Sequence, residues 1–364
     1  HHLLAAVLDD GHDVVAEISP LEFLRRDLLS AATTLTSEQA RYLVDLYYQI
    51  QHNRTTANNQ VKAAKKSAEP HLLIEWVRGQ CYGLERSIVR ILDAYSDMRA
   101  DGVWAKSVFG IGPVLTAGLM AHIDVTKANT ASGVWRFAGL DPTLHWFSKD
   151  EAAKSVTALL LGKTLQRGVV ADSDVETLAS TCGKRADTLR RDAMRFGTDM
   201  KITRVSLTKA LSVCPYNQKL KLLAWKCADS FVKFSNHDEC FYGHLWRQRK
   251  EQEERLNDSG ALAEQAALQL TKKNYRGDTK AKACYEEGKL PPGHVQARSM
   301  RWIAKLFLSH YHHVAYETHF GTPPPKPYVF AIAGHKDFID IPGWPLEASA
   351  ADRAQARSEA KGRD

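Results

Sequence analysis

The stretch Val108–Met120, which reads VFGIGPVLTAGLM, decides the fold because it places two glycines and a proline between two helical patterns. Glycine lets the backbone adopt a positive φ in a tight turn without a Cβ clash, and Gly110 and Gly112 are placed for such a turn. Pro113 fits the first turn of the next helix, because its fixed φ suits that position and the amide that it lacks would have no helical partner there. The stretch therefore predicts two helices joined by a hairpin turn.

The free amides at the start of the second helix are expected to face outward with the positive end of the helix dipole. Such amides form a small site for one phosphate, as in a helix-hairpin-helix nucleic-acid module. The predicted backbone contacts come from Gly110, Ile111, Gly112 and Val114, and the cation of Lys106 precedes the turn. A plain helix cap followed by a turn is the alternative interpretation.

A second motif follows the hairpin at Phe137–Pro142, which reads FAGLDP. Together the two motifs resemble the C-terminal domain of insertion-sequence transposases that pair a RuvC-like nuclease domain with a helix-hairpin-helix domain bearing a nucleophilic serine. The stretch Tyr216–Lys221, YNQKLK, is similar to the Gly-Asn-x-x-Leu-Arg helix of that domain, with Tyr in place of Gly and Lys in place of Arg. The resemblance implies binding of element DNA with a structured guide RNA, and a function in transposition or recombination.

The active site that the resemblance implies is incomplete in this sequence. No stretch carries Asp and Glu on apolar strands in a RuvC-like order, so a Mg²⁺ ion is expected only if another chain supplies the nuclease half. Ser148 is the hydroxyl that stands where the family has its serine, although no glycine lies beside it. Ser148 also fits the N-cap of a helix that begins with Asp150 and Glu151. Both roles, nucleophile and cap, are open for this residue.

The composition is that of a globular protein with one to three domains, since 44% of the 364 residues are hydrophobic and 25% are charged. A formal net charge of +7 and a pI near 9.0 favour an acidic polymer as partner, although a merely soluble basic protein has the same charge. No apolar run reaches the roughly 18 residues of a membrane span and no signal peptide is recognisable, so we expect a cytoplasmic protein with no membrane partner. The scattered cysteines and the lack of a nucleotide-binding loop predict no cofactor.

The patterning predicts a mainly α-helical fold in which a helical arm precedes a helix-hairpin-helix domain with an inserted helical segment. The arm is expected to hold a helix from Ser37 to Ile50, a polar basic loop at 53–67 and a helix from Leu72 to Leu92. In the family that the hairpin resembles, the segment before it takes part in dimerisation, which implies a homo-oligomer through this arm. The predicted regions are a flexible N-terminus (1–18), the helical arm (19–99), the first part of the hairpin core (100–149), the inserted segment (150–213), the second part of the helical domain (214–345) and a disordered tail (346–364).

The inserted segment contains a pattern typical of a helix-turn-helix at Leu178–Arg191. A small Ala lets the helices approach, a Gly four residues later makes the turn, and Leu189 is expected to pack back from the second helix. Cations on the second helix would then reach phosphates or base edges, and these are Lys184, Arg185, Arg190 and Arg191. A plain helical hairpin is the alternative.

Two further helices combine a predicted apolar face with a cationic stripe. After Tyr216 the stripe consists of Lys219, Lys226 and Lys233, and the core face consists of Leu220, Leu223, Ala224, Cys227, Phe231 and Phe234. A final helix from Val295 to Glu317 has a buried seam that includes His310, with Arg298, Arg301, Lys305 and His312 opposite. The two stripes are expected to follow a phosphate backbone.

Three side chains on the final helix also invite a metal-site interpretation, because His310, His313 and Glu317 are three and four residues apart. His310 lies on the apolar seam, where a histidine packed in the core is the simpler explanation, so we expect no metal. The sequence therefore predicts a protein that binds DNA or structured RNA. The alternatives are an active serine recombinase and a helical scaffold for another protein.

Overall fold

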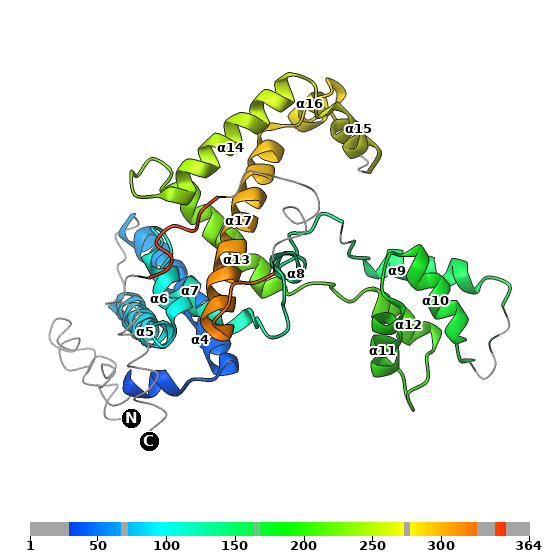
Figure 1. The fold of residues 1–364 in the computed structure, drawn as a ribbon, viewed down its shortest axis with the longest axis horizontal. Coiled ribbons are helices and arrows are strands. Elements are labelled where there is room, and N and C mark those ends of the chain that lie inside the picture. Colours follow the sequence, from blue (N-terminus) through cyan, green and yellow to red (C-terminus); the bar gives the residue numbers. More distant parts are fainter. Residues whose placement is uncertain are drawn as a thin grey trace. The chain divides into compact units, whose positions relative to one another are not determined.

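In a computed structural model, the residues described are 29–66, 72–143, 145–163, 165, 168–272, 277–325 and 339–346. In these ranges the protein is all-helical, with 14 α-helices and no β-strand beyond one isolated bridge between Val169 and Thr203 (Figure 1). The predicted mainly α-helical class is thus confirmed. No helix in the described ranges is long and apolar enough to span a membrane.

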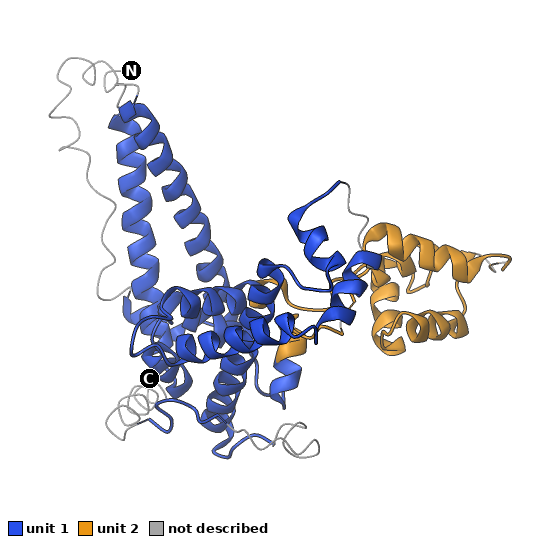
Figure 2. Cartoon of the chain, turned by 90° about the horizontal axis from the view of Figure 1, so that it is seen from above, with its two compact units in different colours: residues 1–134, 222–364 blue, residues 135–221 orange. Residues whose placement is uncertain are grey.

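The chain forms two compact units, which Figure 2 shows in blue and orange. Unit 1 consists of residues 1–134 and 222–364, and unit 2 consists of residues 135–221. Helices α8 (Ala131–Phe137) and α13 (Gln218–Lys233) cross the boundaries between them. The other elements of unit 1 are η2 (Ala31–Thr34), α4 (Ser37–Lys66), α5 (Leu72–Ser96), α6 (Ala100–Ser107), α7 (Pro113–His122), α14 (Phe241–Asp258), α15 (Ala263–Lys272), α16 (Lys280–Glu286) and α17 (Pro292–Phe320).

The helical arm of unit 1 consists of α4 and α5, which pack side by side along their length (Figure 2). The loop predicted at 53–67 is wrong, because α4 continues without interruption to Lys66. Its polar half is held by the same seam as its first half, since Ala57 and Val61 are buried. Across this seam Arg54 forms an ion pair with the buried carboxylate of Glu85 on α5. A few small buried apolar residues are therefore sufficient to hold the polar half of α4 in a helix against α5.

The core of unit 1 is aromatic. Phe231 of α13 stacks on Tyr242 of α14 with ring centroids 4.8 Å apart, and Phe307 of α17 meets both rings edge-on. Trp104 of α6 also stacks on Phe307, with ring centroids 6.1 Å apart, and donates a hydrogen bond to the carbonyl of Pro342. These rings are almost fully buried, and they fix α6, which leads into the hairpin, against α17.

A buried carboxylate adds polar contacts to the same region. Asp101 of α6 is fully buried and accepts hydrogen bonds from Arg99 and, at 2.9 Å, from the hydroxyl of Tyr311 on α17. Burial, and then the neighbouring Asp101, raise the pKa of Tyr311 well above its ordinary value. The tyrosine therefore stays a neutral donor to the carboxylate, and the pair ties α6 to α17.

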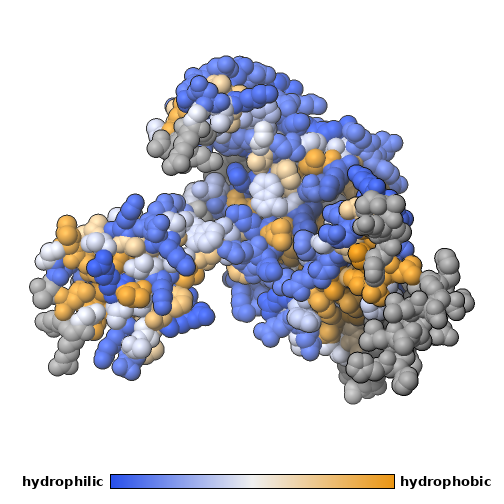
Figure 3. Space-filling view, turned by 180° about the vertical axis from the view of Figure 1, so that it is seen from behind, coloured by the Kyte–Doolittle hydropathy of each residue, from blue (hydrophilic) through white to orange (hydrophobic). Residues whose placement is uncertain are grey.

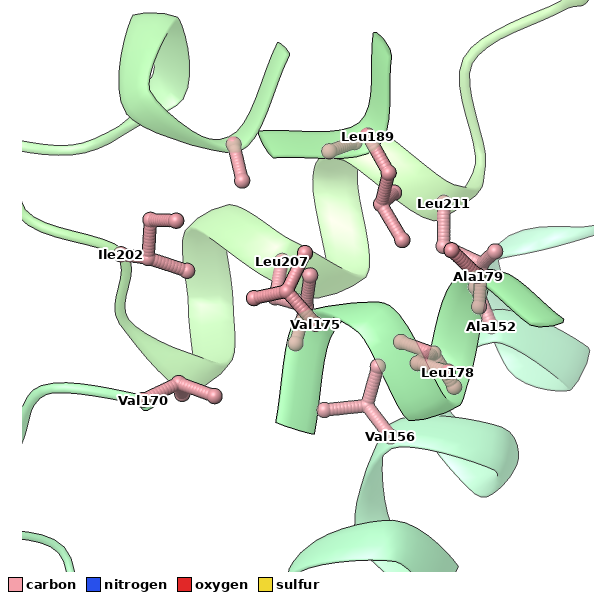
Figure 4. Packing of buried hydrophobic residues seen from close by; sticks show 12 residues of the cluster. Ala152, Val156, Val170, Val175, Leu178, Ala179, Leu189, Ile202, Leu207 and Leu211 are labelled. Atoms are coloured by element: carbon pink, nitrogen blue, oxygen red, sulfur yellow. The ribbon is translucent and has the colours of Figure 1, made fainter. Parts of the chain in front are cut away.

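Unit 2 contains the predicted insertion, and four helices pack around a small core of their own (Figure 4). These helices are α9 (Lys149–Leu160), α10 (Asp172–Thr181), α11 (Ala186–Phe196) and α12 (Arg204–Leu211). The amide of Val170 donates to the carbonyl of Ile202 at 2.7 Å, which joins the segments that precede α10 and α12. The buried side chains of this core are Ala152, Val156, Val170, Val175, Leu178, Ala179, Leu189, Ala193, Ile202, Leu207, Ala210 and Leu211.

The two ends of this unit lie in contact. The amide of Asn217 donates to the carbonyl of Phe137 at 2.8 Å, and the Asn217 side chain accepts from the amide of Leu220 in the first turn of α13. Gly139 has a φ of +64°, and a Cβ there would lie only 2.6 Å from the ring of Tyr216. The FAGLDP and YNQKLK motifs are therefore packed together, although more than 70 residues separate them in the sequence.

The last predicted helix is confirmed as α17, which is longer than expected and ends at Gly321 with a φ of +69°. Residues 1–28 and 347–364 lie outside the described ranges. The predictions of a flexible N-terminus and of a disordered tail fall on these residues.

Candidate nucleic-acid interface

The hairpin lies between α6 and α7, in unit 1. Gly110 has a φ of +91°, as the turn prediction requires, whereas Gly112 has a φ of −96° and serves as the N-cap of α7. Pro113 occupies the first turn of α7, as predicted. Only the first of the two glycines is thus required by backbone conformation.

One side of the hairpin is closed by α13. The hydroxyl of Ser230 donates a 2.6 Å hydrogen bond to the carbonyl of Gly110, and a Cβ at Gly110 would lie 3.0 Å from that hydroxyl oxygen. Phe109 packs edge-on against Phe234 and stacks on His237 at 4.1 Å. Phe234 was predicted to lie in the core, but it stays 44% exposed and covers the turn. The carbonyl side of the turn therefore serves the fold.

The amide side of the hairpin lacks a comparable hydrogen bond, although the side chain of Val114 is buried. In the described part of the chain, the amides of Gly112, Val114 and Leu115 have no hydrogen-bond acceptor. No atom lies within 4 Å of the position that a Cβ of Gly112 would occupy. The amide of Ile111, in contrast, donates to the carbonyl of Val108 at 3.0 Å, and its side chain is buried. The predicted phosphate site is thus left with amides on the α7 side of the turn.

The lysines predicted to support the hairpin are mostly engaged within the chain. Lys106 is half-buried and its Nζ lies 2.5 Å from Asp93 and 2.7 Å from Asp97. Lys226 lies 4.1 Å above the ring of Tyr48 on α4. Exposed Lys233 pairs with Asp229 at 2.6 Å on the same helix face, and Lys219 is exposed in the first turn of α13. In the sequence of α13, Lys233 stands between Ser230 and Phe234, the two residues that contact the turn.

The stripe on α17 is also partly neutralised. Arg298 donates to the carboxylate of Glu253 on α14 at 2.7 Å, and that carboxylate is 1% exposed. Glu253 also pairs with Arg249, so the two arginines share one buried anion. Burial, and then the charge of Arg298, lower the pKa of Arg301. Lys305 lies one turn further along the helix and is half-buried.

In unit 2 the local features of the pattern at Leu178–Arg191 are present, and they fit a helix-turn-helix and a plain helical hairpin equally. Gly183 makes the turn between α10 and α11 with a φ of +64°, and Ala179 and Leu189 are 1% exposed, as the pattern predicts. The four predicted cations divide into two pairs. Lys184 donates to the carbonyl of Leu211 at 2.7 Å, and burial lowers its pKa.

Arg190 contacts three carboxylates, Asp172, Glu176 and Asp187, at 3.0–3.4 Å. Lys184 and Arg190 are thus held within unit 2, while Arg185 and Arg191 are exposed. Sequence reasoning missed Arg195, which is also exposed one turn after Arg191. Its four-residue spacing from Arg191 was the available signal.

Ser148 is the N-cap of α9, as one of its two open roles predicted. The amide of Glu151 donates to its hydroxyl at 3.2 Å, and the amide of Ser148 donates to the Glu151 carboxylate at 2.8 Å. The hydrogen bond from the Ser148 amide, and then one from the Ser148 side chain, lower the pKa of the Glu151 carboxyl. In the described ranges no histidine or lysine is hydrogen-bonded to this hydroxyl, whose neighbour is the Glu151 carboxylate of the same cap.

The histidines of α17 do not converge on a metal site. His310 is buried and bonded to the hydroxyl of Tyr242 at 2.8 Å, whereas His313 lies 3.4 Å from Glu317. His312 was predicted on the polar face, but it is 1% exposed and bonded to the carbonyl of Ala128. Across the described residues, no three His, Cys, Asp or Glu side chains are grouped to hold a metal ion.

Two groups of polar atoms thus remain without a strong partner in the described residues, the amides at the start of α7 and the exposed arginines of α11. Comparison of the chain with known protein families, with curated proteins and with solved structures finds no match.

Proposed function

We propose that this protein binds nucleic acid, and that the amides of Gly112, Val114 and Leu115 hold one backbone phosphate at the start of α7. The observation that carries the proposal is the asymmetry of the hairpin. Its carbonyl side is sealed by Ser230, while these amides lack acceptors in the described part of the chain. A phosphate supplies the acceptors and interacts favourably with the positive end of the helix dipole.

The sequence features around the hairpin support a nucleic acid rather than a small anion. The helix-hairpin-helix-like turn, the FAGLDP motif and the YNQKLK motif resemble the same transposase domain, in which the ligands are DNA and a structured guide RNA. Exposed Lys233 lies beside the turn and can exchange its surface partner Asp229 for a second phosphate, because an exposed ion pair of this kind contributes only about 0.3–0.5 kcal/mol. A role in DNA transposition or recombination is the biological context that this resemblance suggests.

We further propose that the helical arm joins two copies of the chain. Large apolar side chains remain exposed at the start of α5, where α4 does not cover them. Among them Leu73 is 58% and Trp76 is 38% exposed. Hydrophobic residues reach the surface in several places between hydrophilic ones (Figure 3). Because exposure alone therefore does not identify an interface, the patch is tested by changing Leu73 and Trp76 to Glu. We expect light scattering to show a dimer that the double variant dissociates, and a monomeric wild-type protein would contradict the proposal.

The hairpin site is tested by replacing Gly112. This residue has a φ that any amino acid adopts, and a Cβ there meets no atom within 4 Å, so G112D should fold. The new carboxylate would cap the amides of α7 and repel a phosphate. We expect G112D to retain thermal stability and to lose at least about tenfold in affinity for a labelled 30-base-pair duplex and for a structured RNA at low salt.

The matched control is G112A, which leaves the amides open and should bind like the wild type. Equal affinity of G112D and G112A would show that the hairpin is not the site. Failure of the wild-type protein to retard any nucleic acid would favour the helical scaffold instead. For the recombinase alternative, S148A should leave any strand transfer unchanged, because Ser148 is engaged as a helix cap.

A further inference from the structure

We infer that α11 of unit 2 enters the major groove of double-stranded DNA and makes this unit a second, sequence-reading surface. The inference deepens the proposed function, because it names the nucleic acid and a binding element that does not involve the hairpin. It depends on charge distribution, on the packing of α11 and on the dimensions of duplex grooves.

The positive charge of the chain is concentrated in unit 2. Residues 135–221, orange in Figure 2, contain 15 Lys and Arg against 9 Asp and Glu, whereas the rest of the chain contains 34 against 33. This unit therefore carries +6 of the formal net charge of +7. Such a concentration attracts a polyanion to this unit rather than to the chain as a whole.

The packing of α11 leaves one cationic face open. Leu189 and Ala193 turn into the unit 2 core, as Figure 4 shows for Leu189, and fix the helix against α10 and α12. The exposed stripe on the other side repeats at three- and four-residue spacing. It consists of Thr188, Arg191 and Arg195, and the exposed N-cap residue Arg185 directly precedes the helix.

The acidic neighbours do not neutralise this stripe. Arg190, which is not part of the stripe, forms ion pairs with Asp172, Glu176 and Asp187. Among the described residues, Arg191 pairs with one carboxylate, Asp192 at 3.7 Å, which is longer than a hydrogen bond. Arg195 lies near the ring of Phe196, its own neighbour in sequence. The guanidinium groups of the stripe are therefore available to a ligand.

The geometry selects duplex DNA among the nucleic acids. An 11-residue helix such as α11 fits the major groove of B-DNA, which is about 12 Å wide and admits an α-helix. The major groove of an RNA duplex is too deep and narrow to be read by side chains. Proteins that bind single strands stack bases on aromatic rings, and the stripe itself contains none. Arginine can contact guanine in a bidentate manner, and threonine can contact the thymine methyl group.

The test uses the full chain and a duplex sequence selected by the wild-type protein from a randomised 30-base-pair library. R191A/R195A removes two exposed cations without touching the core. The matched control, K154A/K209A, removes two exposed cations from α9 and α12 of the same unit, so the net charge changes equally. We expect R191A/R195A to lose at least about tenfold in affinity for the selected duplex, and the control to lose only a few-fold.

Two further readouts locate the contact. Methylation of guanine N7, which lies in the major groove, should interfere with binding of the wild type but not with the residual binding of R191A/R195A. Affinity for a single strand and for an RNA hairpin should change equally in the two double variants. Equal loss by both double variants on the selected duplex, or no interference by N7 methylation, would overturn the inference.

The hairpin variant separates this inference from the proposed function. If G112D loses affinity while R191A/R195A matches its control, the hairpin proposal stands and the α11 inference fails. If the reverse is found, α11 is the binding element and the hairpin proposal fails. A wild-type chain that binds no probe at low salt would overturn both.

Discussion

The two helix–turn–helix elements of this protein share their local chemistry and differ in what surrounds them. Both turn at a glycine with positive φ, Gly110 between α6 and α7 and Gly183 between α10 and α11. Gly110 is packed against Ser230 and Phe234 of a distant helix, whereas no atom lies within 4 Å of a Cβ placed on Gly183. The first turn is packed on one side against α13, whereas the second turn has no such neighbour.

This difference determines what each element can offer a ligand. The hairpin of unit 1 has its side chains turned into the protein, so it presents backbone amides, which are insensitive to sequence in the ligand. The second element keeps its core contacts on one face of α11 and has arginines on the other, so it presents side chains that can distinguish bases. Under the two proposals, the hairpin would position the nucleic acid and α11 would recognise its bases.

The strongest way to break this comparison is to remove the buried anion that anchors the first element. D101A removes the fully buried acceptor of the buried Tyr311 hydroxyl and of Arg99, whose side chain is partly exposed. We expect a loss of about 3 kcal/mol in the free energy of unfolding of unit 1, because the Tyr311 hydroxyl is left unsatisfied while Arg99 can be hydrated. Hydrogen exchange should show lost protection in α6 and α7 and unchanged protection in α10 and α11.

The control is Y311F, which removes one hydrogen bond and keeps the ion pair, at a cost of about 1–2 kcal/mol. A loss below about 1 kcal/mol for D101A would mean that the aromatic core holds α6 without this contact.

The second largest expected difference between the two units is their loss of stability in acid. Burial lowers the pKa of His310 to about 4, so the folded state binds its proton less readily than the unfolded state, whose histidine has an ordinary pKa near 6.5. The stabilisation is present above pH 6.5 and is lost as the pH falls toward 4, by up to about 3 kcal/mol in unit 1. The one histidine in the sequence of unit 2, His145, is exposed.

Protection of α17 against hydrogen exchange, corrected for the intrinsic effect of pH, should therefore fall between pH 7 and pH 4.5 more than that of α11. H310Q should flatten this dependence. An equal decline in wild type and H310Q would assign it to other groups.

The smallest effects compare the two glycines directly. G110A introduces a strained φ and a Cβ 3.0 Å from the Ser230 hydroxyl oxygen, and we expect it to cost about 2 kcal/mol. G183A has the strained φ but open space, so about 1 kcal/mol is expected. Urea unfolding of both variants measures the difference. Equal costs would show that the packing of α13 on the hairpin adds nothing to its stability.

Several features of the candidate surfaces could be predicted because they depend on neighbouring residues. The proline in the first turn of α7, the cap formed by Ser148 and the inward position of Leu189 follow from spacing within one or two helical turns. The prediction of a loop at 53–67 was wrong because its polar composition concealed the sparse seam of Ala57 and Val61 against α5.

Which cations are free could not be predicted in the same way. Lys184 donates a hydrogen bond to the last residue of α12, and Arg298 forms an ion pair with a carboxylate of α14. Lys226 lies over an aromatic ring of α4. Each of these partners is more than 20 residues away in the sequence, so helical periodicity alone gives no sign of it. Arg195, in contrast, is exposed only because nothing in the described part of unit 2 reaches it beyond its neighbour Phe196.

The sequence by itself determined the helix starts at Pro113 and Ser148 and the turns at Gly110 and Gly183, because backbone conformation there depends on residues within a few positions. Only the tertiary structure decided which side of each turn stays open and which charges remain unpaired. Those outcomes depend on contacts such as Ser230 on Gly110 and Leu211 on Lys184, which exist only once distant segments have packed together.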